Sequence, residues 1–262
     1  MTESTQHPSA RPPADRPLPL VEVHDDAEAL ATAVAGELLN RIADLQASGQ
    51  VPQIALTGGT IADAVHREVA RLADEAGVDW GALDLWWGDE RYVAADSDDR
   101  NAAQARAAFL DAVGVPAHRV HEVPATGAAC SVEEAARAYA AEFGERELDV
   151  LMLGVGPDGH VASLFPHSRQ LDADGVTAAV SDSPKPPPAR VSLTDPALNR
   201  AHVVWLVASG EGKAEAVAKA LAEVEVEGDD ALDAALRETP ARGVRGRVET
   251  TFFLDTEAAS RL

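Results

Sequence analysis

The segment GVGPDGH at residues 154–160 places a carboxylate and an imidazole, Asp158 and His160, two positions apart in a glycine-rich turn. A histidine has an unperturbed pKa of about 6.5, so its neutral ring can take a proton from water near neutral pH. A nearby carboxylate can fix the tautomer and stabilise the cation that forms. The pattern predicts an acid–base pair, and the alternative is a histidine that only braces its own loop.

The glycines of this turn, Gly154, Gly156 and Gly159, also match the dinucleotide-binding pattern G-x-G-x-x-G after a strand. We discount the match because Pro157 removes one backbone donor and Asp158 would place a negative charge against a pyrophosphate. A dinucleotide site also needs an acid at the end of a second strand about twenty residues later, where this chain has a polar turn. The turn is therefore predicted to present its acid and histidine, with Gly156 and Gly159 beside the substrate.

A second glycine turn, TGGT at residues 57–60, follows another apolar run. Glycines let backbone N–H groups approach a ligand, and a helix N-terminus favours an anion. Thr57, Gly58 and Gly59 are therefore candidate phosphate contacts. The alternative is an ordinary tight turn that needs glycine for its backbone angles.

Charged residues also lie at the ends of three other apolar runs, where they could line the same cleft. In WWGDERYV, residues 86–93, Arg91 can hold a phosphate bidentately, while Asp89 and Glu90 can orient it or bond sugar hydroxyls. Lys213 lies at the start of a helical stretch in SGEGK and matches a cation held toward the same cleft, and Arg190 in ARVSLT could reach that cleft. The alternative for these groups is a solvated surface position.

Apolar runs of β type alternate with amphipathic helical stretches and must position these residues. Strands are expected at residues 20–24, 53–56, 83–87, 148–154, 176–180, 189–193, 202–209 and 250–255. Helices are expected at about 25–45, 60–76, 98–111, 133–143, 210–224 and 230–238, with Ser131 and Glu134 forming a capping box. The proline-rich run at 183–188 is expected to be an extended surface loop.

This alternation predicts an α/β fold with three layers, a doubly wound, mostly parallel, Rossmann-like sheet covered by helices. Ligands of such sheets bind outside the carboxyl ends of the strands. Four loops follow predicted strands and are expected to meet at that edge: TGGT, GDER, GVGPDGH and SGEGK.

Composition limits the classes of function. The chain has 262 residues and a net charge of −22, which disfavours nucleic acid and anionic membranes as partners, so an anionic substrate would need a local cationic pocket. No apolar run reaches the length of a membrane helix, and the start lacks a signal-peptide core, so we expect a cytoplasmic protein. A single cysteine, Cys130, fits a reducing compartment and carries no function.

The chain is expected to form a single domain over residues 19–262, preceded by a disordered tail at 1–18 that is rich in proline and poor in bulky apolar side chains. The histidines other than His160 show no ligand spacing with cysteines or carboxylates, so no metal site is expected. The oligomeric state is left between a monomer and a small homo-oligomer.

Taken together, TGGT, GDERYV, GVGPDGHVASLFP, ARVSLT and SGEGK occur in an order and spacing that resembles the 6-phosphogluconolactonase family, which is related in fold to glucosamine-6-phosphate deaminases. The resemblance covers nearly everything from Leu20 to the end. Some positions depart from the usual family residues, with Thr57 in place of serine, Ala62 and Ala94 in place of proline, and Val161 in place of threonine. None of these changes removes a charged or acid–base group.

The resemblance implies hydrolysis of 6-phospho-D-glucono-1,5-lactone to 6-phospho-D-gluconate in the oxidative pentose phosphate pathway, without a cofactor. His160 would be the general base that activates water, with Asp158 as its support and loop amides near residues 156–159 stabilising the oxyanion. The phosphate would be held by Arg91 and Lys213, with Arg190 as a further candidate, and Thr57, Gly58 and Gly59 would line the same end.

Two alternatives remain. An amino-sugar-phosphate deaminase or isomerase of the same fold carries a glutamate seven positions after the aspartate of the related loop, and this chain has Phe165 there. Without that carboxylate, ring opening and isomerisation lose a proton-transfer group, which favours hydrolysis. A non-catalytic sugar-phosphate sensor is the second alternative, although binding alone would not require an acid–base pair.

Overall fold

The computed structural model describes residues 16–223 and 229–262. Most of the predicted tail, residues 1–15, lies outside the described residues, as does the last residue of the helix predicted at 210–224. Arg16 is described, and its guanidinium donates to the carbonyl oxygens of Asn199, at 2.6 Å, and Arg245. The part of the chain just before the first strand is thus hydrogen bonded to two loops that lie far from it in sequence.

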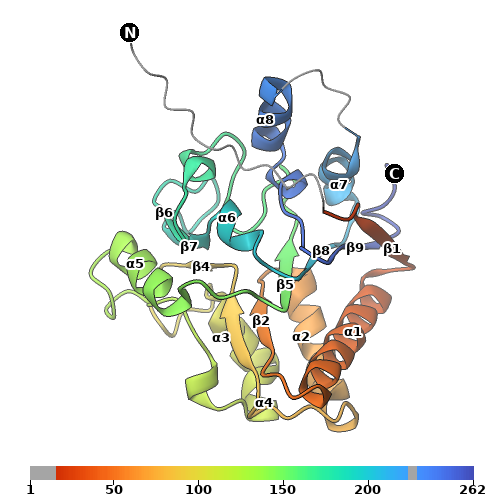
Figure 1. Ribbon diagram of the computed structural model, residues 1–262, viewed down its shortest axis with the longest axis vertical. Helices are drawn as coiled ribbons and strands as arrows, with labels where there is room; N and C mark the ends of the chain where they lie inside the picture. Colours follow the sequence, from red (N-terminus) through yellow and green to blue (C-terminus); the bar gives the residue numbers. More distant parts are fainter. Residues whose placement is uncertain (1–15, 224–228) are drawn as a thin grey trace.

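The central layer is a six-stranded parallel sheet in the order β1-β9-β8-β5-β2-β3 (Figure 1). This arrangement confirms the predicted α/β fold with a mostly parallel, doubly wound sheet. The strands lie close to their predicted positions: β1 (Leu20–His24), β2 (Gln53–Leu56), β3 (Asp84–Trp87), β5 (Val150–Gly154), β8 (Val203–Ala208) and β9 (Glu249–Asp255).

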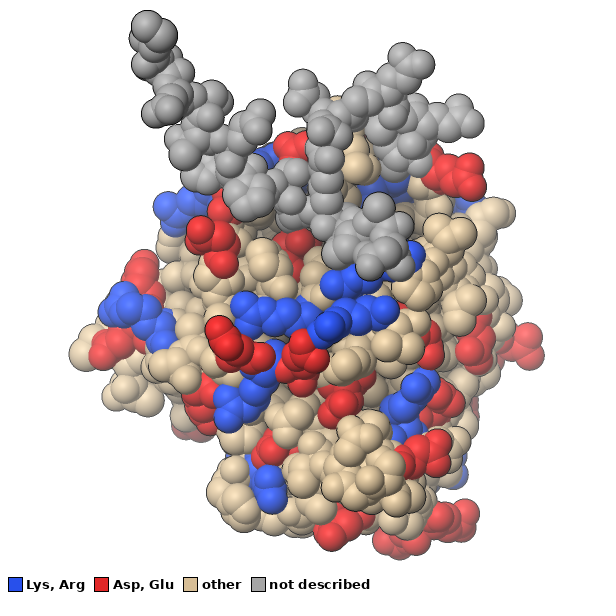
Figure 2. Space-filling view, in the orientation of Figure 1, with Lys and Arg blue, Asp and Glu red and all other residues tan. Residues whose placement is uncertain are grey.

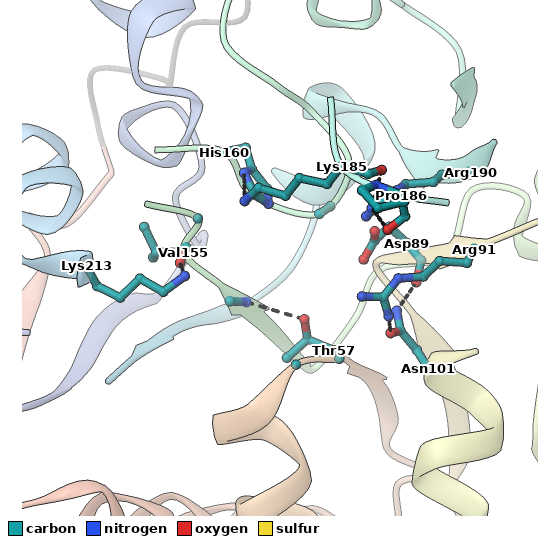
Figure 3. A pocket seen from close by; sticks show the side chains of 15 residues that line it. Thr57, Asp89, Arg91, Asn101, Val155, His160, Lys185, Pro186, Arg190 and Lys213 are labelled. Carbon is teal, nitrogen blue, oxygen red and sulfur yellow. Dashed lines mark hydrogen bonds between the residues drawn. The ribbon is translucent and has the colours of Figure 1, made fainter. Parts of the chain in front are cut away.

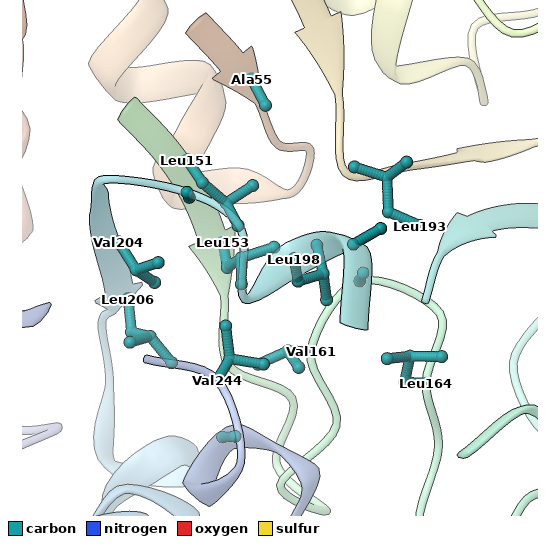
Figure 4. Packing of buried hydrophobic residues seen from close by; sticks show 14 of the residues in the cluster. Ala55, Leu151, Leu153, Val161, Leu164, Leu193, Leu198, Val204, Leu206 and Val244 are labelled. Atoms are coloured by element: carbon teal, nitrogen blue, oxygen red, sulfur yellow. The ribbon is translucent and has the colours of Figure 1, made fainter. Parts of the chain in front are cut away.

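Helices cover both faces of this sheet. Successive side chains of a strand point to opposite faces, so a continuously apolar strand presents apolar side chains that must be buried on both. In β5, Val150 and Met152 pack into one apolar cluster, whereas Leu151 and Leu153 pack into the other. The first cluster is closed by α1 (Ala27–Ala47), α2 (Thr60–Leu72), α3 (Asn101–Ala105) and the π-helical turn η2 (Arg106–Leu110). The second, shown in Figure 4, is closed by α5 (Val132–Phe143), α6 (Asp195–Leu198) and α7 (Ala214–Leu221).

Among the described residues, the remaining α-helices are α4 (Asp111–Val113), which follows η2, and α8 (Asp229–Glu238). The helix predicted over 98–111 therefore begins three residues late and contains a π-helical turn. The capping interaction predicted for Ser131 is present at α5, where its hydroxyl accepts from the N–H of Glu134 at 3.2 Å. The carboxylate of Glu134 returns to the N–H of Cys130, at 2.7 Å, instead of to Ser131 itself.

A second, antiparallel sheet was not expected from the sequence. It has the order β4-β7-β6 and consists of β4 (Asp89–Arg91), β6 (Thr177–Val180) and β7 (Arg190–Leu193). The segment GDERYV was predicted to be a polar turn, but its first part is strand β4. Three residues are too few to show an alternating pattern, and their partner lies about a hundred positions away in the chain.

The order of the large sheet reverses between β2 and β5. From β2 the chain passes outward to β3, whereas β5 lies on the other side of β2 and leads to β8. The loops that leave β2 and β5 therefore diverge and open a crevice, the usual binding position in doubly wound sheets. A hydrogen bond from the N–H of Gly154 to Oγ1 of Thr57, at 3.3 Å, links the two loops at the base of this crevice.

Candidate active site

The crevice at the reversal point contains most of the predicted site residues (Figure 3). It is lined by Thr57, Gly58, Gly59, Asp89, Arg91, Asn101, Gly154, Val155, Gly156, His160, Ala162, Lys185, Pro186, Arg190 and Lys213. Of the predicted site residues, Glu90, Asp158 and Gly159 are outside this lining. Asp158 nevertheless contacts His160 directly, whereas Glu90 and Gly159 have other roles.

His160 and Asp158 form the predicted pair. Nδ1 of His160 lies 2.5 Å from Oδ1 of Asp158. Burial alone would raise the pKa of Asp158, but its hydrogen bond to His160, the charge of that ring and the nearby Lys185 lower it well below the usual range. An ionised Asp158 accepts the proton of Nδ1, which leaves the lone pair on Nε2. The imidazole is therefore in the tautomer that a general base requires.

Gly156 makes room for this pair. A Cβ at this position would lie 2.0 Å from Nδ1 of His160 and 2.5 Å from Oδ1 of Asp158. Gly159 has a different reason for being glycine, because its φ is +85° and its backbone is close to Thr239. The two glycines thus shape the turn, one by omitting a side chain and the other through its backbone angle.

Two N–H groups of this turn are already engaged. Gly156 donates to the carbonyl oxygen of His160 at 2.8 Å, and Gly159 donates to that of Gly156 at 2.9 Å. Pro157 has no N–H. Two of the amides expected to stabilise an oxyanion near residues 156–159 thus already have acceptors within the turn.

Strand β4 separates the three charged residues of GDER. Because side chains alternate along a strand, Asp89 and Arg91 face the crevice and Glu90 faces the opposite side. Glu90 is buried and accepts hydrogen bonds from the N–H groups of Asn101, at 2.8 Å, and Ala102, at 2.9 Å, at the start of α3. Burial raises its pKa. Glu90, predicted as a substrate contact, thus lies outside the lining of the crevice, and its carboxylate holds the start of α3.

Asp89 is buried and accepts a hydrogen bond from the hydroxyl of Ser163 at 2.6 Å. Ser163 follows Ala162, which has a φ of +50°, in the segment that continues from His160. Asp89 therefore fixes the course of this segment, in addition to lining the crevice. This contact was not anticipated, because the sequence gives no sign that residues 89 and 163 meet.

Arg91, Asn101 and Gly58 meet on one side of the crevice. Nη1 of Arg91 donates to Oδ1 of Asn101, and a Cβ at Gly58 would lie 1.8 Å from that oxygen, so a side chain there would displace the amide of Asn101. Among the hydrogen bonds of the described residues, none uses the N–H of Gly58 or Gly59. These donors lie at the N-terminus of α2, beside a guanidinium, which is a suitable arrangement for an anion. Asn101 was not predicted as a site residue.

Lys213 approaches from the opposite side. It ends the 3-10 turn η5 (Glu211–Lys213), and its Nζ donates to the carbonyl oxygen of Val155 at 2.7 Å. Burial lowers the pKa of Lys213, as does the nearby Lys185. The loop before it is held by Asp255 at the end of β9, whose carboxylate accepts from Oγ of Ser209 at 2.5 Å and from the N–H of Gly210 at 3.0 Å.

Arg190 lines the crevice but is partly engaged by the chain itself. It is buried at the start of β7, and its Nε and Nη2 donate to the carbonyl oxygens of Pro187, at 3.1 Å, and Lys185, at 3.0 Å. The proline-rich segment is a surface loop, as predicted, but it also brings Lys185 over the crevice. Nζ of Lys185 lies 3.5 Å from Nδ1 of His160 and 3.7 Å from Oδ1 of Asp158.

Lys185 was missed because a lysine among prolines has no periodic pattern that would show where its side chain points. The available signal was its rarity, since the chain has only three lysines.

Together with Arg91, Arg190 and Lys213, Lys185 gives the crevice four cationic side chains. Figure 2 shows basic side chains gathered in a band across the middle of one face, near the carboxyl end of β5. The strongly acidic chain thus has the local cationic pocket that an anionic substrate requires.

A family model described as glucosamine-6-phosphate isomerases/6-phosphogluconolactonase matches residues 25–253. The chain belongs to this family. It is 42% identical over 257 residues to the 6-phosphogluconolactonase of Streptomyces coelicolor, covering 93% of this chain and 95% of the relative. It is 39% identical to that of Mycobacterium tuberculosis, covering 92% and 98%.

The family fold is also found among solved structures. A 6-phosphogluconolactonase from Trypanosoma brucei matches with a TM-score of 0.74 and 27% identity, and the match covers 93% of this chain and 98% of the other.

Within the described residues no group of three or more histidines, cysteines and acids is arranged to hold a metal ion. None of the described helices combines the length and apolar character needed to cross a membrane.

Proposed function

We propose that this member of the glucosamine-6-phosphate isomerase/6-phosphogluconolactonase family hydrolyses 6-phospho-D-glucono-1,5-lactone to 6-phospho-D-gluconate, as in the oxidative pentose phosphate pathway. The observation that carries the proposal is the His160–Asp158 pair, joined at 2.5 Å at the edge of a crevice with four cationic side chains. The names of the relatives that match over nearly the whole chain support the same reaction.

In the proposed mechanism Nε2 of His160 takes a proton from water while the water oxygen attacks the lactone carbonyl carbon, C1. Asp158 keeps Nδ1 protonated and stabilises the imidazolium that forms. The bond between C1 and the ring oxygen then breaks, and the ring oxygen receives the proton held by Nε2. The C1 carbonyl re-forms as the ring opens, and the resulting carboxylic acid releases the second proton of the water to solvent, which gives 6-phospho-D-gluconate. One water is consumed, no redox change occurs, and no cofactor takes part.

The phosphate is placed at the side of the crevice away from His160. Arg91 and Lys213 approach that region from opposite sides, and Thr57 lies between them at the base (Figure 3). The unengaged N–H groups of Gly58 and Gly59 add two donors at the N-terminus of α2. A substrate with a phosphate at one end and a carbonyl at the other can thus contact both groups of residues simultaneously.

Phe165 favours hydrolysis over amino-sugar isomerisation. Its ring lies 4.6 Å from the ring of His160, so the neighbour of the proposed base is an aromatic side chain in place of a carboxylate. A second proton-transfer group of the kind that ring opening and isomerisation require is absent at this position. The sensor alternative is distinguished by activity, because a sensor would bind the sugar phosphate without accelerating lactone hydrolysis.

The deciding assay follows freshly generated 6-phosphogluconolactone with and without the purified chain, with glucosamine 6-phosphate deamination measured in parallel. We expect hydrolysis faster than the spontaneous reaction and no release of ammonia. His160→Ala should abolish most of the turnover, whereas His118→Ala, at an exposed position, serves as the matched control. Equal rates with and without the chain would exclude the proposal, and tight ligand binding without turnover would favour the sensor.

We further expect the protein to act in the cytoplasm on a small sugar-phosphate lactone, as a monomer or a small homo-oligomer. The net charge of −22 argues against nucleic acid and membrane surfaces as partners. The single cysteine fits a reducing compartment.

A further inference from the structure

Attack of water on C1 converts the carbonyl oxygen into an oxyanion, and stabilising that charge is usually a large part of catalysis in acyl transfer. In the turn that carries His160, the N–H groups of Gly156 and Gly159 are engaged within the turn, and Pro157 has no N–H. A charged donor from another element that reaches the same end of the crevice would stabilise the oxyanion more strongly than a neutral amide.

Lys185 is the cation placed at that end. Its Nζ lies 3.5 Å from Nδ1 of His160, and Figure 3 shows its side chain extending alongside the imidazole. Arg91 and Lys213 lie on other sides of the crevice. The carboxylate of Asp158, 3.7 Å from Nζ, holds the ammonium group near the base without neutralising its donor capacity, since an ammonium has three N–H bonds.

The backbone of Lys185 is fixed by Arg190. The buried guanidinium donates to the carbonyl oxygens of Lys185, at 3.0 Å, and Pro187, at 3.1 Å, which lie on either side of Pro186. It also lies over the ring of Phe165, with its carbon 5.7 Å from the ring centre. The same Phe165 ring lies 4.6 Å from the ring of His160, so the guanidinium of Arg190 contacts both the proline-rich loop and the aromatic neighbour of the base.

We propose that Lys185 is a catalytic residue that stabilises the oxyanion at C1, and that Arg190 is a positioning residue that acts through it. This inference rests on the proposed lactone hydrolysis. The ammonium donates a hydrogen bond to the carbonyl oxygen as negative charge develops, and it keeps its proton throughout. The proton taken from water goes to Nε2 of His160 and then to the ring oxygen when the C1 bond to that oxygen breaks.

The first test replaces the ammonium by an uncharged chain of similar length in Lys185→Met, with Lys219→Met, an exposed lysine, as the control. Removing one oxyanion donor typically lowers kcat by about 100-fold or more, and we expect a loss of about 100-fold for Lys185→Met. The control should retain parental kcat. A Lys185→Met variant with kcat within about threefold of the parent would overturn the proposal.

Two ligands distinguish the C1 end from the phosphate end. 6-Phosphogluconate carries a carboxylate at C1, whereas glucitol 6-phosphate carries the phosphate but no C1 charge. Lys185→Met should weaken binding of 6-phosphogluconate by about tenfold and leave glucitol 6-phosphate unchanged, because a charged hydrogen bond is lost only at C1. Equal weakening of both ligands would place Lys185 on the phosphate and would overturn the proposal.

The positioning role of Arg190 is tested by Arg190→Lys, which keeps the charge but cannot donate to two carbonyl oxygens in the same geometry. We expect kcat to fall about tenfold in this variant, with glucitol 6-phosphate binding retained as evidence of folding. In a Lys185→Met background the same change should have little further effect, because Arg190 acts through Lys185. Losses that multiply would show that Arg190 acts independently and would overturn this role.

The parent chain is measured in the same assay. A parent that does not accelerate hydrolysis removes the proposed function and this inference with it. An active parent combined with an active Lys185→Met variant removes only the assignment of Lys185.

Discussion

Replacing Gly156 by alanine tests whether the packing of the His160–Asp158 pair sets the rate. The added Cβ would lie 2.0 Å from Nδ1 and 2.2 Å from Cε1 of His160. Restoring an ordinary contact of about 3.4 Å requires the ring to move by about 1.4 Å. A misplacement of about 1 Å can cost about 100-fold in rate, so we expect kcat of Gly156→Ala to fall by about two orders of magnitude.

The loss should be one of activity and not of folding. The backbone at Gly156 lies outside the left-handed region, so an alanine there is not strained, and the clash involves side chains at the edge of the crevice that can turn away. Urea unfolding should therefore give nearly the parental midpoint, while the lactone assay shows the reduced kcat.

The matched control is Gly36→Ala in the middle of α1, where a Cβ has no neighbour within 4 Å. It should retain parental kcat and gain about 1 kcal/mol of stability, because glycine is a poor residue in a helix. If Gly156→Ala hydrolysed the lactone at the parental rate, the close packing of imidazole and carboxylate would not be what limits turnover.

Three other substitutions probe single contacts. Arg91→Ala should raise KM by about tenfold or more with a smaller effect on kcat, measured by steady-state kinetics, because a charged contact to the phosphate is lost. Glu90→Gln should lower the free energy of unfolding by about 3 kcal/mol in urea titrations, because a buried acceptor of N–H groups at the start of α3 is weakened beside the buried Arg100; a change below about 1 kcal/mol would contradict that role. Burial, opposed by a hydrogen bond from Asn199, raises the pKa of Asp195 to about 7. Between about pH 4 and 7 the unfolded chain has released this proton and the folded chain has not, so stability falls as pH rises. Asp195→Asn should therefore gain on the parent by about 1.4 kcal/mol per pH unit across that window in unfolding experiments, and parallel pH profiles would refute the assignment.

Most of the central sheet could be predicted because its strands other than the exposed edge strand β1 are buried on both faces. Residues such as Val150, Leu151, Met152 and Leu153 all pack into apolar clusters, which requires the continuous apolar run seen in the sequence. The loops after β2, β5 and β8 meet at one edge of the sheet because parallel strands all end at the same edge, so parallel pairing alone was enough to predict their meeting. The adjacency of Asp158 and His160 is local in the chain and was predicted on that ground.

The side-chain directions of charged residues could not be predicted in the same way. Asp89, Glu90 and Arg91 are consecutive, and only the pairing of β4 with β7 decides that the middle residue turns away from the crevice. Asn101 enters the site because Glu90 anchors the start of α3 beside β4. These contacts join segments that a pattern of hydrophobicity leaves unrelated, so no local signal could place them.

Phe165 connects the choice of reaction with the geometry of the site. A glutamate at this position would offer the guanidinium of Arg190 a charged partner and would compete with the carbonyl oxygens of Lys185 and Pro187 for its donors. It would also place a second negative charge beside His160. The aromatic ring contacts both Arg190 and the imidazole without accepting a strong hydrogen bond from either. Phe165 therefore favours hydrolysis in two linked ways. It supplies no second proton-transfer group beside His160, and it leaves the donors of Arg190 free to hold the proline-rich loop.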